Sequence, residues 1–197
     1  MITINIKHNI DQVIRELKVN LPRAIEQAQV SALNKTADGA KTRMVRAISA
    51  TYKINQSVVR DRLFIARASR KGGATFTASL IGSGKPSMNI IHFVERKVTL
   101  AEAKRRRKGG TLNQLRFQIK RAGGLKTIEG AFIGNQGRTV FRRTGQSRLP
   151  IEPIRTIDIP GMFRSRQNTG EVTAWIRDNF NRIFERELKF YLARQGK

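Results

Sequence analysis

The sequence contains no cysteine, which excludes disulfide bonds and cysteine-ligated zinc sites and suits a reducing compartment. It also has no run of about 18 apolar residues, so we expect no transmembrane helix. From Ile2 to Ile6 apolar and polar residues alternate, which predicts a short strand, whereas a signal peptide needs a continuous apolar stretch. These absences together predict a chain made in the cytosol, with no membrane role.

Residues that could carry catalysis are also scarce. The two histidines, His8 and His92, are far apart in the chain, and the 14 carboxylates are dispersed among basic residues. The segment from Gly82 to Ser87 superficially resembles a phosphate-binding loop. However, the positions that need glycine and a hydroxyl hold Ser79 and Pro86. A nuclease would need clustered carboxylates for its metal ions. We therefore predict a non-enzymatic protein without a catalytic site, metal or cofactor.

Positive charge is present in large excess. Against the 14 acidic residues stand 39 lysines and arginines, which gives a formal net charge of +25. A chain with this charge repels itself unless a negative partner lies nearby. Nucleic acid, an anionic membrane surface and an acidic protein are the three candidates. The composition does not distinguish nucleic acid from an acidic protein as the partner. The membrane is the weakest candidate, because the aromatic residues of the last helix fit a protein core better than an interface.

Periodicity predicts long helices at both ends of the chain. The first would begin at Asn9 or Asp11, and the second would run from Pro22 to about Ala50. The second helix would span roughly 43 Å, so it would cross the whole domain or project beyond it unless Gly39 kinks or ends it. Its predicted buried face consists of apolar and mostly small residues at steps of three and four: Ile25, Ala28, Ala32, Leu33, Ala37, Ala40, Met44, Ala47 and Ile48.

The last helix should begin at Asn168, which forms a capping-box pattern with Glu171. Its apolar stripe comprises Val172, Trp175, Ile176, Phe180, Ile183, Phe184, Leu188, Tyr191 and Leu192.

Short apolar or alternating segments separate these helices and predict strands. After a short helix that starts at Asn55 or Ser57, these segments are 65–68, 75–81, 90–94, 115–120, 129–133 and 139–142. The last two should form a hairpin through the residues from Gly134 to Gly137. The overall prediction is an α+β fold in which the helices pack on a central antiparallel sheet. Residues 1–197 form a single domain, and residues 97–126 form a basic loop or hairpin extension.

The extension carries the densest positive charge. Its basic residues are Lys104, Arg105, Arg106, Arg107, Lys108, Arg116, Lys120 and Arg121. A basic run of this kind is commonly a solvated loop. Alternatively it faces DNA phosphates, where several cations together give a strong, salt-dependent affinity without sequence preference, or it faces an acidic protein ring. Phe117 is the only aromatic residue between Phe93 and Phe132, which argues against a reader of unstacked bases.

Several motifs, in order, resemble those of the phage minor tail protein Z family. They are the strand-like Gly130–Ile133, the segment Arg138–Arg143, and Arg148–Ile151, preceded by Ala32–Ala37. Thr139 stands where the family often has histidine. The resemblance extends from about residue 28 to about residue 190.

The resemblance implies a structural virion protein at the head-proximal end of the tail. Such tail-completion proteins help the finished tail join the head and help DNA enter the tail. Implied partners are other tail and head–tail connector proteins, phage DNA by non-specific contact, and further copies of the chain. Related connector and terminator proteins commonly form rings, often six-fold. The protein would pass through the host cytoplasm during assembly.

The family offers no catalytic residues to carry over. Within the motifs we expect the apolar residues to fill the core and the arginines Arg142, Arg143 and Arg148 to face an interface. A non-specific nucleic-acid-binding protein is the alternative function.

Overall fold

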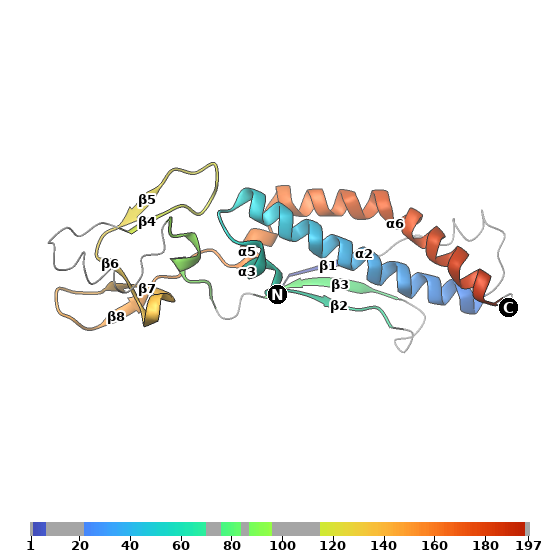
Figure 1. Cartoon of the computed structure of the whole chain (residues 1–197), viewed down its shortest axis with the longest axis horizontal. Helices are drawn as coiled ribbons and strands as arrows, with labels where there is room; N and C mark the ends of the chain where they lie inside the picture. The colour runs from blue at the N-terminus through green and yellow to red at the C-terminus, as the bar shows by residue number, and fades with distance from the viewer. Residues whose placement is uncertain (1, 7–21, 70–75, 84–86, 96–114, 196–197) are drawn as a thin grey trace.

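The computed structural model describes residues 2–6, 22–69, 76–83, 87–95 and 115–195 (Figure 1). It is elongated: two long helices and one three-stranded sheet lie at one end, and the other two described sheets lie at the other end. The α+β class predicted from the sequence is confirmed. The predicted first helix, from Asn9 or Asp11 to Leu21, lies outside the described residues.

Helix α2 (Pro22–Thr51) is continuous through Gly39, which confirms the predicted long helix over the alternative that it ends at this glycine. With 30 residues it is about 45 Å long and follows the long axis of the molecule (Figure 1). Its predicted inner face is confirmed, because every member is buried except Ile25, which is half-buried. Thr36 and Ser49 are buried on the same helix, although periodicity of apolar residues does not reveal them.

Helix α6 (Arg166–Gln195) packs along α2 in the opposite direction. Five residues of its predicted stripe are buried at successive steps of four: Val172, Ile176, Phe180, Phe184 and Leu188. Trp175 is half-buried and lies against Gly39 of α2. Because Gly39 and the alanines of α2 have little or no side chain, the large residues of α6 can approach the α2 backbone.

The predicted capping box at the start of α6 is wrong. The helix begins at Arg166, and Asn168 lies inside it with only 1% of its surface exposed. Its Nδ2 donates to the Met162 carbonyl at 2.9 Å, and its Oδ1 accepts from Thr51 Oγ1 at 3.1 Å. Asn168 therefore joins the end of α2 to the residues that precede α6, which is a tertiary role that local capping rules do not include.

The first sheet combines strands that are distant in the sequence. It contains β1 (Ile2–Ile6), β3 (Ala78–Gly82) and β2 (Leu63–Ala66) in the order β1-β3-β2, with both pairs antiparallel. Alternate residues of the central strand β3 are buried, and α2 packs against this strand. The strands predicted around residues 2–6, 65–68 and 75–81 are thereby confirmed within the described residues.

The other strands form two further sheets, so the predicted single central sheet is wrong. One is the hairpin of β4 (Leu115–Phe117) and β5 (Lys126–Ile128). The other has the order β6-β7-β8, and its first two strands form the predicted hairpin, connected through the 3₁₀ turn η3. The bounds are β6 Ala131–Gly134, η3 Asn135–Gly137, β7 Thr139–Arg143 and β8 Ile151–Pro153.

Short helices complete the described fold. Helix α3 (Gln56–Arg60) follows Asn55, which confirms one of the two predicted starts. The apolar segment near residue 90 is the 3₁₀ helix η2 (Ile90–Phe93) instead of a strand. Helix α5 (Ile159–Phe163) begins with Asp158, whose carboxylate accepts from the Gly161 amide at 2.9 Å. Pro160 lies in the first turn of α5, a position that tolerates proline because an amide there has no partner within the helix.

Candidate basic interface

The structure places part of the predicted basic extension. Arg116 is exposed on β4, and Lys120 and Arg121 are exposed on the turn that follows it. The five residues from Lys104 to Lys108 lie outside the described residues. The structure therefore describes the charged surface of the extension only in its second half, from Leu115 onwards.

This second half is anchored to the end of α2. The Lys53 amide donates to the Ile119 carbonyl at 2.8 Å, and the Arg121 amide donates to the Thr51 carbonyl at 3.0 Å. On its other side, the Gln118 amide donates to the Phe93 carbonyl at 2.9 Å. Backbone hydrogen bonds on both sides fix the position of this segment, so Arg121 projects from a defined place instead of a solvated loop.

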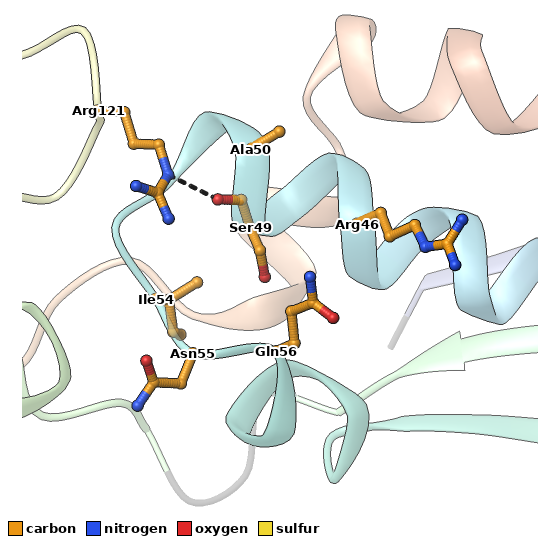
Figure 2. Close-up of a pocket in the computed structure, with 7 residues that line it drawn as sticks. All are labelled: Arg46, Ser49, Ala50, Ile54, Asn55, Gln56 and Arg121. Carbon is orange, nitrogen blue, oxygen red and sulfur yellow. Dashed lines mark hydrogen bonds between the residues drawn. The ribbon is translucent and has the colours of Figure 1, made fainter.

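Arg121 forms one wall of a pocket of about 380 Å³ beside the end of α2 (Figure 2). Two arginines, three other polar residues and two apolar residues line it: Arg46, Ser49, Ala50, Ile54, Asn55, Gln56 and Arg121. These described residues include two arginines and no acidic side chain, so together they carry net positive charge.

Two groups in this pocket have unusual surroundings. The Arg121 Nε donates to the Ser49 carbonyl at 2.8 Å, which holds the guanidinium at the edge of the pocket (Figure 2). The Ser49 residue is 7% exposed, and its hydroxyl has no hydrogen-bond partner among the described residues. Arg46 is exposed on the rim, and its side chain extends away from Arg121 (Figure 2).

The three arginines predicted at an interface do not form one cluster on β7. All three are exposed. Arg142 and Arg143 are consecutive on the strand and therefore project from opposite faces of the sheet. Arg143 lies 5.7 Å from the centre of the Phe132 ring, whereas Arg142 is opposite Glu152 of β8. Arg148 follows in the connection to β8.

A second polar cluster joins the two long helices at their other end. Glu187 of α6 is 3% exposed, and its Oε2 accepts from Lys35 Nζ at 2.6 Å and from Ser31 Oγ at 2.9 Å. Burial raises the pKa of Glu187, but these hydrogen bonds, the Lys35 charge and a hydrogen bond from Arg186 together outweigh burial and lower the pKa below its usual value. The charged form is thus the one that stabilises the fold.

We expect Glu187→Gln to lower the free energy of unfolding by about 1–2 kcal/mol near neutral pH, a modest value because Lys35 is half-exposed. A carboxylate with a lowered folded pKa contributes stability above its unfolded pKa and loses it as the pH falls through the folded pKa. The deficit should therefore shrink below about pH 4.5. Chemical denaturation at several pH values measures it. The exposed Glu185→Gln is the matched control, and an equal deficit at every pH would contradict the assignment.

The prophage minor tail protein Z (GPZ) family matches residues 7–195, which is nearly the whole chain. The chain belongs to this family. The tail completion protein of Escherichia phage N15 is 27% identical over 148 residues, which is 74% of either chain. No solved structure matches.

Family membership settles the general role and leaves the site open. As a minor tail protein Z family member, the chain is a structural protein of a phage tail. In the part of the chain that the structure describes, no helix is long and apolar enough to cross a membrane. In the same residues, no group of three or more acidic, histidine or cysteine side chains could hold a metal ion.

Of the residues that line this pocket, only Arg121 is a candidate site residue from the sequence, and the others are not singled out. Arg46 occupies the polar face of a predicted helix, where an arginine is unremarkable, and Ser49 is one serine near the end of that helix. Asn55 was considered only as a helix start. No local signal joins residues 46–56 to Arg121, because the backbone hydrogen bonds that bring them together are long-range.

Proposed function

We propose that this protein is a non-enzymatic tail-completion component at the head-proximal end of the tail, in the neck region. There it forms a homo-oligomeric ring that supports head–tail joining and DNA passage. The family match over residues 7–195 is the observation that carries this proposal. Its partners are other tail and head–tail connector proteins, and it assembles in the host cytoplasm before it becomes part of the virion.

Two features of the chain support an assembled state. The net charge of +25 requires negative neighbours to offset self-repulsion. Few side chains of the sheet β6-β7-β8 are fully buried, and every residue of β6 is half-buried. Phe132 and Phe141, both half-buried, stack with their ring centres 6.0 Å apart. A small sheet of this kind gains apolar burial when another protein covers it.

Electron microscopy of particles with a label on this protein tests the position. We expect the label at the junction of tail and head, at a copy number consistent with one ring. A label along the tail shaft, at the distal tip or only in the free protein fraction would contradict the proposal.

The basic run from Lys104 to Lys108 is proposed to face the DNA path. If it does, replacing Arg105, Arg106 and Arg107 by serine removes three cations from that path and weakens attraction to DNA phosphates. We expect tails of normal appearance but at least about a ten-fold loss of infectivity, with DNA retention or ejection impaired. Replacement of three arginines elsewhere, Arg177, Arg182 and Arg194 on α6, controls for charge. Normal infectivity of the first variant would contradict the proposal.

Non-specific nucleic-acid binding by the isolated chain is the second candidate function, and the net charge favours it. It requires tight binding to DNA. The logarithm of the binding constant should fall linearly with the logarithm of the salt concentration. Absence of binding to duplex DNA at low salt would eliminate this candidate and leave the structural role intact. An acidic protein neighbour would then be the partner that offsets the charge.

A further inference from the structure

The pocket beside the end of α2 holds a cation in a fixed orientation without an anion. The hydrogen bond from Arg121 Nε to the Ser49 carbonyl uses one of five guanidinium donors. Within the described residues, no ion pair involves Arg121 or Arg46. The terminal nitrogens of a guanidinium fixed in this way match the two oxygens of a carboxylate or phosphate.

The Ser49 hydroxyl is the second indication of a ligand. The residue Ser49 lines the pocket, and its hydroxyl oxygen is buried, has no hydrogen-bond partner among the described residues, and points toward the side where Gln56 lies (Figure 2). Buried polar groups in native proteins are nearly always hydrogen-bonded, so each exception calls for an explanation. A bound group that accepts the Ser49 hydrogen bond would explain this one, and Arg121, whose Nε donates to the carbonyl of the same residue, lines the same pocket.

We propose that this pocket binds the carboxylate of an aspartate or glutamate side chain on a peptide segment of a neighbouring tail protein. The proposal rests on the assembly role proposed above and names the chemistry of one contact within it. Arg121 binds the carboxylate, and Ser49 donates a further hydrogen bond. Arg46, an exposed side chain that changes rotamer within nanoseconds, closes over the bound group from the rim.

The neutral residues of the pocket favour a peptide over the phosphates of DNA. Asn55 and Gln56 both line it, and a side-chain amide offers a donor and an acceptor. A peptide backbone also has both, whereas a phosphodiester only accepts. Ala50 and Ile54 supply apolar walls for the methylene groups of an acidic side chain. The pocket also presents only two cations, whereas proteins that hold DNA contact many successive phosphates.

A titration of the full-length protein with a single-carboxylate peptide tests the proposal. The probes are acetyl-Ala-Glu-Ala-amide and its Gln counterpart, at about 0.15 M salt so that general attraction to a chain of charge +25 is screened. Nuclear magnetic resonance of arginine side chains reports binding. We expect the Glu peptide to shift the Arg121 Nε–H signal and to bind at least about ten-fold more tightly than the Gln peptide.

Two pocket variants and one control separate binding from folding. Ser49→Ala removes an unsatisfied hydroxyl, so it should weaken binding of the Glu peptide at least about five-fold while the thermal midpoint stays the same or rises. Arg46→Gln should weaken binding about ten-fold. Arg177→Gln makes the same charge change on an exposed part of α6 outside the pocket, and it should alter binding less than about two-fold.

Several results would overturn the proposal. Equal affinity for the two peptides would show that the carboxylate is not recognised, and equal effects of Arg46→Gln and Arg177→Gln would show only general electrostatics. A 20-base-pair DNA duplex that binds through Ser49 and Arg121, with no binding of the Glu peptide, would identify a phosphate site instead. Failure of the assembly role would be seen separately, as absence of the protein from particles.

Discussion

Gly39→Ala is expected to destabilise the protein by about 2 kcal/mol, although alanine normally stabilises a helix by about 0.5–1 kcal/mol relative to glycine. A Cβ atom at position 39 would lie 2.1 Å from Cη2 of the Trp175 ring and 2.8 Å from Cζ3. Two non-bonded carbon atoms cannot lie this close together, so either the indole must move or α2 and α6 must separate. Glycine is thus required here by the close approach of the two helices.

Movement of the indole would not be free of cost. Trp175 is half-buried, belongs to the residues packed on the core, and has the Arg43 guanidinium 5.5 Å from its ring centre. Turning the ring toward solvent would lose apolar burial and this cation–π contact, each of which contributes on the order of 1 kcal/mol or more. Separation of the helices would loosen the packing on either side of the contact.

Chemical denaturation of four proteins measures the effect and identifies its cause. These are the wild type, Gly39→Ala, Trp175→Ala and the double variant. With the indole gone, Gly39→Ala should become stabilising by about 0.5–1 kcal/mol, so the sign of its effect reverses. Gly170→Ala on α6 is the matched control, because apart from its chain neighbours and its own helix backbone no atom of the described residues lies within 4 Å of its added Cβ. Stabilisation by Gly39→Ala in the wild-type background would contradict the assigned contact.

The helices were predictable because their signal is local and repeated. In α2 the small apolar residues recur at steps of three and four, and this periodicity indicated both the length of the helix and its buried face. The role of Gly39 was not predictable, since a glycine inside a helical pattern is compatible with a kink, an end or a close contact. Only the position of Trp175, far along the chain, distinguishes these.

The arrangement of the strands was less predictable for the same physical reason. Alternation located the strands but says nothing of their partners, and β3 pairs with β1 across more than 70 residues. Segments that end in polar turns are compatible with one sheet or several. Asn168 shows a related limit, because its sequence pattern fits a helix cap while its side chain satisfies Thr51 and the Met162 carbonyl.

The candidate site was partly predictable. Charge density indicated the extension that contains Arg121, and the family motifs indicated the class of protein. The pocket depends on contacts between residues 46–56 and the turn at Arg121, which no periodicity or motif encodes. A buried hydroxyl without a partner, such as that of Ser49, is also invisible in a sequence.

Asn89→Asp is expected to lower the free energy of unfolding by about 2–3 kcal/mol near neutral pH, because one side chain docks the sheet β6-β7-β8. The Asn89 Oδ1 accepts from the Val140 amide at 2.9 Å, and its Nδ2 donates to the Val140 carbonyl at 3.1 Å. Aspartate replaces that donor with an oxygen that faces the carbonyl. Two polar acceptors would then oppose each other in a partly buried position.

The docking is local enough for a single change to disturb it. Around Asn89, the Ile90 amide donates to the Ile154 carbonyl at 3.1 Å and the Thr156 amide donates to the Met88 carbonyl at 2.9 Å. These backbone bonds persist in the variant, so we expect loosening of the sheet instead of global unfolding. The sheet carries Arg142 and Arg143 and most of the family motifs, so its loosening should also reduce incorporation into particles.

Hydrogen exchange at the Val140 amide, together with chemical denaturation, measures the effect of Asn89→Asp. Exchange at Val140 should accelerate at least about 30-fold, which corresponds to about 2 kcal/mol of lost protection. Acidification should restore part of the stability, because a protonated carboxyl regains a donor for the Val140 carbonyl. Asn135→Asp in the turn η3, which connects β6 and β7 of the same sheet, is the control, since Asn135 is exposed and among the described residues its Nδ2 donates to Thr139 Oγ1, at 3.4 Å. If the two variants exchange alike at Val140, Asn89 does not hold the sheet in place, and its docking must depend on the backbone bonds and the buried Val140 side chain.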